Sequence, residues 1–134
     1  MVGPVRDRTL IRAGSRFEEV FGYSRAVRVG PWICVSGCTA AAPGGPVGGA
    51  DCAAQTREAL ERVAKALEEA GASLREVVRT RFFVTDITSW EAIGEIHAEL
   101  FADIWPATTI VGVSALADPA LLVEVEADAI VMDR

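Results

Sequence analysis

The clearest alternation of hydrophobic and polar residues lies near the C-terminus, at residues 106–131, which read PATTIVGVSALADPALLVEVEADAIV. The second half of this segment alternates between apolar and acidic residues: Val123, Val125 and Ala127 against Glu124, Glu126 and Asp128. Successive side chains of a strand point to opposite faces, so the segment predicts two strands joined by a short turn. Three carboxylates on one face are typical of a solvated sheet face. If a partner subunit covers that face, they need cations or hydrogen bonds and become candidates for chemistry.

Residues 76–86, EVVRTRFFVTD, form the strongest predicted strand, because β-branched and aromatic residues dominate it. Its alternation predicts two faces: Val78, Thr80, Phe82 and Val84 on one, and Val77, Arg79, Arg81 and Phe83 on the other. The first face suits a cover of helices. The arginines of the second face call for anionic partners if they are covered, and the acidic face of the last strand could supply them as cross-strand pairs.

Two segments have the spacing of amphipathic helices. The first follows Asp51, a good N-cap, and runs to Gly71, with an apolar stripe formed by Ala53, Leu60, Val63, Ala64 and Leu67. The second is expected to begin with a capping box formed by Thr88 and Glu91 and to end before Pro106. Its inward face is predicted to carry Trp90, Ile93, Ile96, His97, Leu100 and Phe101.

The remaining strands are shorter. They are expected at residues 9–11, 25–29 and 32–36, the last two forming a hairpin, with a glycine-rich flexible loop at residues 40–50. The whole chain, residues 1–134, is therefore expected to be one α+β domain with a single mixed sheet and two helices on one of its faces. That arrangement leaves the other face bare, and Val77 and Phe83 beside two arginines favour its burial by self-association.

Composition and charge exclude several classes of function. The chain has 134 residues, 51% of them hydrophobic, and a net charge of −6. Because its basic residues form no cluster, neither RNA nor DNA is an expected partner, and a ribonuclease activity fits poorly. No apolar run approaches the ~20 residues that span a bilayer, and the first residues lack the apolar middle of a signal peptide. We therefore expect a cytoplasmic protein without a membrane partner.

The cysteines and the histidine indicate neither a disulfide framework nor a metal site. Cys34, Cys38 and Cys52 are an odd number, and an extended chain would hold the first two about 13 Å apart, at ~3.3 Å per residue. With His97 as the single histidine, a zinc site would need all three cysteines from scattered positions. No metal site is therefore expected.

Over nearly its whole length the sequence resembles the Rid proteins, the reactive-intermediate deaminases also called YjgF-like. The matching landmarks are Gly22-Tyr-Ser-Arg-Ala-Val27, Val35-Ser-Gly37, the Gln55 helix ending in Glu69-Ala-Gly71, Val78-Arg-Thr-Arg-Phe-Phe-Val-Thr-Asp86, Pro106-Ala-Thr-Thr109 and Val123-Glu-Val-Glu-Ala127. The ordered set is specific, although no single piece is. The resemblance implies a fold like that of a bacterial chorismate mutase: a homotrimer with a central barrel of sheets, helices outside, and ligand clefts between subunits.

The resemblance also implies a reaction. Rid proteins hydrolyse enamines and imines derived from amino acids, giving a 2-keto acid and ammonia without a metal or cofactor. In the family, an arginine after a Pro-Ala pair binds the substrate carboxylate, a task suited to the guanidinium fork. In this sequence that position is Thr108. This departure removes the cation on which the binding of ordinary 2-imino acids depends.

Other family positions carry over unevenly. Tyr23 matches a tyrosine near the cleft, Ser36 and Gly37 match the pair whose backbone lines it, and Glu124 matches the glutamate proposed to orient water. The family's helix asparagine is Gly94, an aromatic position is His97, and the residue two past the arginine is Ile110. The resemblance thus predicts Glu124 as the catalytic residue, with Tyr23, Ser36, Gly37, Thr108 and Ile110 as contacts of a small-molecule ligand.

Each of these residues also has a structural interpretation. Tyr23 could be a packing residue, Ser36 and Gly37 could end a strand, and a histidine on an apolar stripe is more often a hydrogen-bonded core residue than a base. Arg81 either reaches the ligand beside Thr108 or forms a salt bridge with Glu124 or Glu126.

Two functions follow from these alternatives. The first is a metal-independent hydrolase of the enamine or imine deaminase type, with a specificity altered by Thr108. The second is a non-catalytic trimeric protein that binds a small ligand or has a regulatory role.

Overall fold

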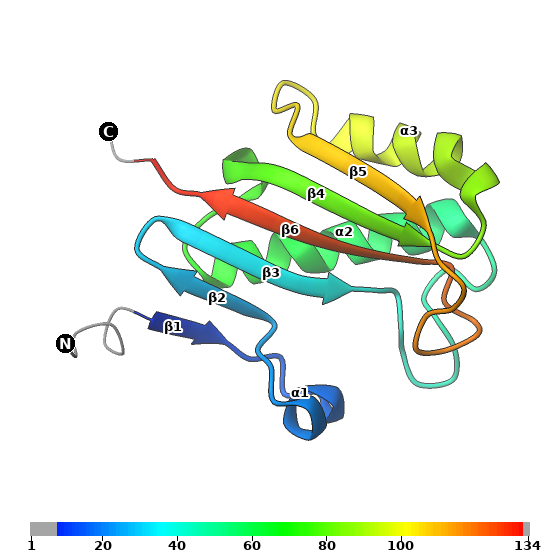
Figure 1. The fold of residues 1–134 in the computed structure, drawn as a ribbon, viewed down its shortest axis with the longest axis horizontal. Helices are drawn as coiled ribbons and strands as arrows, with labels where there is room; N and C mark the ends of the chain where they lie inside the picture. The colour runs from blue at the N-terminus through cyan, green and yellow to red at the C-terminus, as the bar shows by residue number, and fades with distance from the viewer. Residues whose placement is uncertain (1–7, 133–134) are drawn as a thin grey trace.

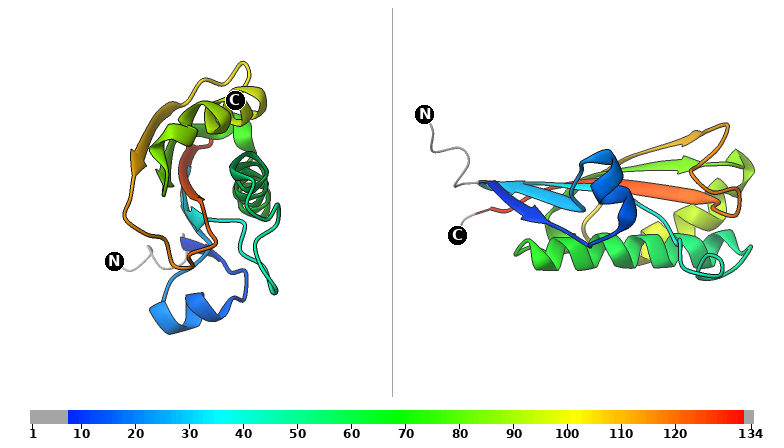
Figure 2. Two further views of the ribbon diagram at one scale, coloured as in Figure 1. Left: turned by 90° about the vertical axis from the view of Figure 1, so that its right-hand side faces the viewer. Right: turned by 90° about the horizontal axis from the view of Figure 1, so that it is seen from below.

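A mixed sheet of six strands forms the frame of the structure, a computed structural model that describes residues 8–132 (Figure 1). The strands lie in the order β1 (Arg8–Ile11), β2 (Ala26–Val29), β3 (Trp32–Cys38), β6 (Val123–Ile130), β4 (Val77–Val84) and β5 (Ala107–Gly112). All neighbours are antiparallel except β4 and β5. Helices α2 (Cys52–Glu69) and α3 (Trp90–Leu100) cover one face of the sheet (Figure 2). The expected α+β fold with one mixed sheet is therefore confirmed.

Helix α2 forms where its sequence signals predict it. The Asp51 side chain accepts hydrogen bonds from the amides of Ala53 and Ala54, which have no partner inside the helix. The helix buries Leu60, Val63 and Leu67 completely against the sheet, and Gly71 follows it in the left-handed conformation with φ of 88°. Neither α2 nor any other helix among residues 8–132 is long and apolar enough to cross a membrane.

Strand β6 has the two faces that its alternation predicts. Val123, Val125, Ala127 and Ala129 are buried beneath the helices, while Glu124, Glu126 and Asp128 are half-buried on the opposite side. We call this second side, which α2 and α3 do not cover, the open face (Figure 2). The carboxylates therefore lie on the sheet surface that remains available to a partner or a ligand.

Strand β4 departs from the predicted alternation at its start. A register shift in its pairing with β6 lies between Val77 and Arg79, and it turns Val77 toward the helices, where it is 3% exposed. Val78, predicted on the helix side, is instead 42% exposed. The prediction was wrong for these two residues because a bulge breaks the period of two. Thr80, Phe82 and Val84 lie on the helix side as predicted.

The start of α3 also differs from the prediction. Thr88 and Glu91 form no capping box; Asp86 caps a short 3₁₀ turn, Ile87–Ser89, by accepting a hydrogen bond from the Thr88 amide. Trp90 is 56% exposed and does not point inward. Ser73 and Glu76 do form a capping box, ahead of β4.

Two features near the N-terminus were not predicted. Residues Arg16–Phe21 form a short helix, α1, beside the β1 and β2 end of the sheet (Figure 1). Strand β3 does not stop at Gly37, as the glycine suggested, but continues through an irregularity to Cys38. Both features lie next to residues that the sequence places in the ligand site.

Candidate functional site

The carboxylate of Glu124 lies against the backbone of Gly37. The pairing of β3 with β6 shifts register between Val35 and Cys38, and this irregularity brings Gly37 under the Glu124 side chain. A Cβ atom added to Gly37 would lie 2.8 Å from Cδ of Glu124 and closer still to its Oε2. Because Gly37 has no side chain, there is room for the carboxylate at this place.

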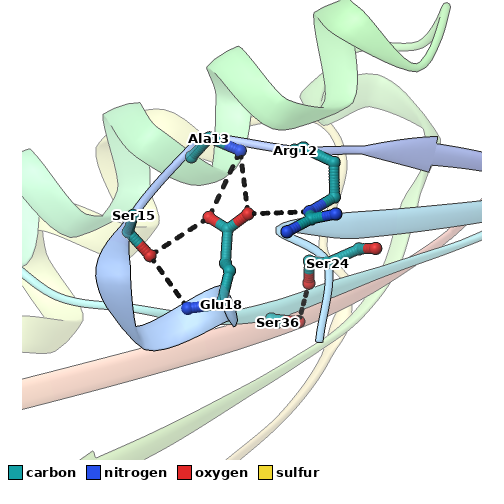
Figure 3. Close-up of polar contacts among 6 residues, drawn as sticks. All are labelled: Arg12, Ala13, Ser15, Glu18, Ser24 and Ser36. Carbon is teal, nitrogen blue, oxygen red and sulfur yellow. Dashed lines mark hydrogen bonds and ion pairs between the residues drawn. The ribbon is translucent and has the colours of Figure 1, made fainter. Parts of the chain in front are cut away.

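Arg25, at the end of the loop before β2, contacts the same part of β3. Its Nη1 donates hydrogen bonds to the carbonyl oxygens of Gly37 at 2.6 Å and Ser36 at 3.3 Å. Its guanidinium carbon lies 5.8 Å from the centre of the Tyr23 ring, within the range of a cation–π contact. The Ser36 hydroxyl donates to the Ser24 carbonyl at 2.6 Å, which ties this loop to β3 (Figure 3).

We call Tyr23, Arg25, Ser36, Gly37 and Glu124 the Glu124 cluster. Four of these five residues were predicted as site residues from the sequence; Arg25 was not, although it lies two residues after Tyr23. Burial raises the pKa of Glu124, the charge of Arg25 opposes that rise, and the carboxylate of Glu126 adds to it. The side chain thus binds a proton more readily than an ordinary glutamate, as a general base near neutral pH requires.

Helix α1 holds Tyr23 through an unusual buried carboxylate. The Glu18 side chain is completely buried and accepts hydrogen bonds from Arg12 Nε at 3.1 Å, from the Ala13 amide and from the Ser15 hydroxyl (Figure 3). The backbone carbonyl of Glu18 in turn accepts from the amides of Gly22 and Tyr23. The position of Tyr23 therefore depends on the conformation that Glu18 imposes on this turn.

Burial would raise the pKa of Glu18, but the hydrogen bonds from Arg12 and from the backbone amides of Ala13, Gly14 and Ser15 outweigh it, so the pKa lies below its ordinary value. The sequence contained a signal for this arrangement. Ser15 and Glu18 have the S-x-x-E spacing of a capping box, and the Ser15 hydroxyl does accept from the Glu18 amide. This helix start was not predicted.

Replacing Glu18 by Gln is expected to loosen the turn that carries Tyr23. The loss of a charged acceptor for several buried donors should cost about 2 kcal/mol of local stability. The measurement is hydrogen exchange at the Ala13 and Gly22 amides, which should speed up while those of α2 stay protected. A lowered folded-state pKa means that the carboxylate stabilises the fold above the ordinary carboxyl pKa, and that this effect disappears as the pH falls through the lowered value. The difference between wild type and variant should therefore shrink in acid; a constant difference would contradict the argument.

Thr108 lies in a second group of polar residues. Its hydroxyl lies 2.8 Å from the hydroxyl of Thr80 on β4 and 3.4 Å from Nε2 of His97 on α3, and Nε2 is 3.0 Å from the Thr80 hydroxyl. Thr108 itself is exposed, whereas Thr80 is completely buried. We call Thr80, His97 and Thr108 the Thr108 cluster.

His97 is held by aromatic neighbours. Its ring centre lies 4.5 Å from that of Phe101 and 5.4 Å from that of Phe82. Burial lowers its pKa, so the ring is neutral near pH 7. A neutral imidazole with a hydroxyl partner and aromatic walls agrees with the interpretation of His97 as a hydrogen-bonded core histidine.

The two clusters lie on opposite faces of the sheet in one protomer. Glu124 pairs with Phe83 and points to the open face, whereas Thr108 pairs with the buried Thr80 on the helix side. Ile110, two residues along the same strand, packs partly buried against the core beneath the helices. A single protomer therefore does not bring Thr108 and Ile110 together with Glu124.

Arg81 takes the salt-bridge alternative. Its Nη1 lies 2.9 Å from a carboxylate oxygen of Glu126 and 3.4 Å from one of Asp128, across the β4–β6 pair. The expectation of anionic partners from the acidic face of β6 is confirmed. Arg81 points to the open face and Thr108 to the helix side, because side chains alternate along β4, so a single protomer does not bring the two together.

A shallow, open depression of about 400 Å³ lies beside α1 and is lined in part by Tyr23, Ser24 and Glu18. Tyr23 is the one member of the Glu124 cluster that lines it; Arg25, Ser36, Gly37 and Glu124 do not. Among residues 8–132, no three histidine, cysteine, aspartate or glutamate side chains lie close enough together to hold a metal ion. The chemistry available at the Glu124 cluster is that of a carboxylate, a guanidinium and backbone polar groups.

Known proteins resemble this chain in sequence. A family model described as endoribonuclease L-PSP matches residues 13–131. An uncharacterized protein of Streptomyces coelicolor is 35% identical over 119 residues, which cover 89% of each chain. The 3-aminoacrylate deaminase RutC of Acinetobacter baylyi is 39% identical over 75 residues, 56% of this chain and 59% of that protein.

A solved structure resembles it in fold as well. The crystal structure of a Mycobacterium tuberculosis protein, described as a member of the highly conserved YjgF/YER057c/UK114 family, superimposes with a TM-score of 0.86 at 53% sequence identity. The match covers 92% of this chain and 99% of that one. The family match, residues 13–131, includes strands β2 to β6, both long helices and the residues of the two clusters.

Proposed function

This chain belongs to the endoribonuclease L-PSP family, which includes the YjgF and Rid proteins, and from that premise we propose that it hydrolyses the C=N bond of an imine-type metabolite, including the imine tautomer of an enamine. The observation that carries the proposal is the Glu124 cluster, where a carboxylate with a raised pKa lies over a glycine backbone on the open face. A relative named as a 3-aminoacrylate deaminase supports the reaction class.

The complete site forms between protomers in this proposal. One protomer presents the Glu124 cluster on its open face, and the Thr108 cluster lies on the other side of the sheet near the edge strand β5. Proteins of this family are typically homotrimers. A trimer that packs the open faces around a central axis would set the Glu124 cluster of one protomer beside the β5 edge of the next. Such packing would also cover the exposed apolar side chains of the open face.

The reaction needs no group beyond the chain and water. Glu124 accepts a proton from a water molecule whose oxygen attacks the imine carbon, giving a tetrahedral carbinolamine. The same carboxyl group completes the carbinolamine by giving that proton to the nitrogen. It then takes the hydroxyl proton of the carbinolamine and passes it to the nitrogen as the C–N bond breaks, and the products are a carbonyl compound and ammonia. Hydrogen bonds from the backbone near Gly37 orient the substrate. Exclusion of bulk water strengthens the electrostatic interaction between Glu124 and the reacting groups.

Thr108 sets the specificity in this proposal. A threonine hydroxyl offers one hydrogen bond and no charge where relatives with an arginine offer a bidentate cation. Here the hydroxyl is held by Thr80 and His97. The substrate therefore carries a neutral or smaller group at this position than an ordinary 2-imino acid does.

The test is imine hydrolysis with substrates generated in situ from several amino acids. We expect slow turnover of ordinary 2-imino acids by the wild type and a gain of at least about tenfold for Thr108→Arg, since a charged hydrogen-bond pair is worth that much. Adding Glu124→Ala should remove the gain. Thr109→Arg, on the same strand but facing the other way, is the matched control and should gain nothing.

Two outcomes would contradict the proposal. Rapid clearance of ordinary 2-imino acids by the wild type would contradict the role of Thr108 in specificity. An absence of turnover in the wild type and in Thr108→Arg would favour the alternative function, a non-catalytic protein that retains a ligand cleft.

A further inference from the structure

We propose that the exposed apolar side of α1 packs against the start of α3 in the next protomer, and that this contact closes one end of the ligand cleft. The apolar side of α1 consists of Phe17, Val20 and Phe21, and the surface that it meets consists of Ile87 and Trp90. The inference rests on the site between protomers in the proposed function. It concerns the assembly of that site and not the reaction.

Helix α1 buries its charge and exposes its apolar residues. Glu18 is its one buried residue. Phe17, Val20 and Phe21 are 65%, 75% and 85% exposed. Residues three and four apart lie on the same side of a helix, so these three side chains form one continuous apolar surface. A helix in contact with water normally has the opposite arrangement, and an exposed apolar surface of this kind marks an interaction site.

The apolar side of α1 is held next to the Glu124 cluster. The Phe21 ring meets the Tyr23 ring edge to face, with ring centres 6.2 Å apart. Gly22 follows Phe21 in the left-handed conformation, and the amides of Gly22 and Tyr23 both donate to the Glu18 carbonyl. These bonds fix the orientation of α1 relative to Tyr23. A surface that covers Phe21 therefore also borders the ligand site at Tyr23.

The order of the strands identifies the part of a second protomer that α1 can reach. Strands β1 and β5 are the two edges of the sheet, and α1 lies beyond the β1 edge (Figure 1). In a closed ring of identical subunits the interfaces are heterologous, so one edge of each protomer meets the opposite edge of the next. Helix α1 therefore faces β5 of the next protomer together with α3, which contacts β5 through His97 and Thr108.

The pairing of β4 selects the start of α3. Glu124 pairs with Phe83, near the end of β4 from which the chain continues to Ile87 and Trp90. In the proposed ring the axis runs along the strands, and a rotation about this axis moves no residue along it. The Glu124 end of one protomer therefore meets the Glu124 end of the next. Ile87 and Trp90 are exposed there and supply an apolar surface for α1.

Trp105 does not meet this condition, although it is the more exposed tryptophan. It precedes β5, whose first residue, Ala107, pairs with Arg79 near the start of β4. Trp105 therefore lies at the end of the sheet opposite to Glu124. This difference between Trp90 and Trp105 provides the control for the experiment.

The test is a cysteine cross-link between Phe21→Cys and Trp90→Cys in one chain. Cys34 and Cys52, which are not buried, are first replaced by serine, and the buried Cys38 is kept. We expect a short bis-maleimide to join the two variant positions between protomers and to give covalent dimers and trimers on a denaturing gel. Each variant alone should give monomers, because a heterologous contact does not bring a residue beside its own copy.

Phe21→Cys combined with Trp105→Cys is the matched control and should give no covalent oligomer. Three results would overturn the inference. The control pair could cross-link as well as the first pair. The first pair could fail to cross-link in a protein that sedimentation shows to be trimeric. The wild type could fail to associate at all.

Sedimentation equilibrium of Phe17→Ser and Val20→Ser supplies a measurement that needs no cysteine. Both side chains are exposed in the protomer, so the fold should persist, as far-UV circular dichroism checks. We expect each variant to associate at least about tenfold more weakly than the wild type, the value of burying one apolar side chain. Trp105→Ser should associate like the wild type. Unchanged association in both α1 variants would contradict the inference.

Imine turnover on the same proteins separates this inference from the proposed function. Covalent trimers of the Phe21→Cys and Trp90→Cys chain, in a protein whose wild type shows no turnover, would reject the deaminase function and keep the contact. Turnover in a trimer that does not cross-link at these positions would keep the function and reject the contact.

Discussion

Replacing Glu124 by Gln is expected to lower kcat for imine hydrolysis by about 10²–10⁴-fold, the usual contribution of a positioned general base. Glutamine keeps the size and the hydrogen-bonding outline of the side chain but cannot accept a proton from the attacking water. The fold should survive, because Glu124 is only half-buried and lies on the open face. The measurement is steady-state hydrolysis of the imine that the wild type turns over best.

The pH dependence of the same reaction supplies a second readout. Burial raises the pKa of Glu124, with Arg25 opposing the shift. The base works in its deprotonated form, so activity should fall as the pH falls through a pKa above the ordinary carboxyl value. That acid limb should be absent from the residual activity of Glu124→Gln.

Glu126→Gln is the matched control for this prediction. Glu126 lies on the same face of the same strand, but its carboxylate is bound to Arg81. Its replacement should change kcat little. An equal loss of activity in both variants would mean that the general charge of the open face, and not a base at position 124, supports the reaction.

Replacing Gly37 by Ala is expected to reduce activity nearly as much, by about 10²-fold or more, through displacement of the Glu124 carboxylate. The added Cβ would lie 2.8 Å from Cδ of Glu124, which is too close for a real contact. The clash is with the end of a flexible side chain, so the carboxylate can rotate away at little cost to stability. The loss should therefore appear in kcat, while thermal unfolding changes little.

A double variant tests this explanation directly. If Gly37→Ala acts only by moving Glu124, then Gly37→Ala combined with Glu124→Gln should be no less active than Glu124→Gln alone. Gly112→Ala is the control, because its added Cβ would make an ordinary contact with Ile87 at 3.6 Å. Multiplicative losses in the double variant would show that Gly37 has a separate role.

The elements with regular periods were predictable from the sequence. Strand β6 keeps one hydrophobic period, and its predicted apolar residues, such as Val125, are buried. In α2 the predicted Leu60, Val63 and Leu67 are buried, whereas Ala53 and Ala64 are only partly so. The failures occurred where the period breaks. A bulge in β4 exchanged the faces of Val77 and Val78, and a 3₁₀ turn replaced the expected capping box at Thr88. Such breaks depend on pairing with distant strands, which a local pattern does not contain.

The candidate site was predictable only in part. Tyr23, Ser36, Gly37 and Glu124 were identified by the family resemblance, and the structure places them in one cluster. Arg25 and Glu18 were not identified, because their importance comes from contacts with the β3 irregularity and with the turn before α1. The resemblance also identified Thr108, but not its contacts with Thr80 and His97.

The sequence by itself determined the α+β class, the apolar and acidic faces of β6, and the absence of an arginine at position 108, because periodicity and residue identity are properties of the chain alone. Only the tertiary structure decided that Arg81 pairs with Glu126 and Asp128, that Gly37 makes room for Glu124, and that Thr108 faces away from that carboxylate. These outcomes depend on strand order, register and bulges, which set the neighbours of each side chain across segments far apart in the chain.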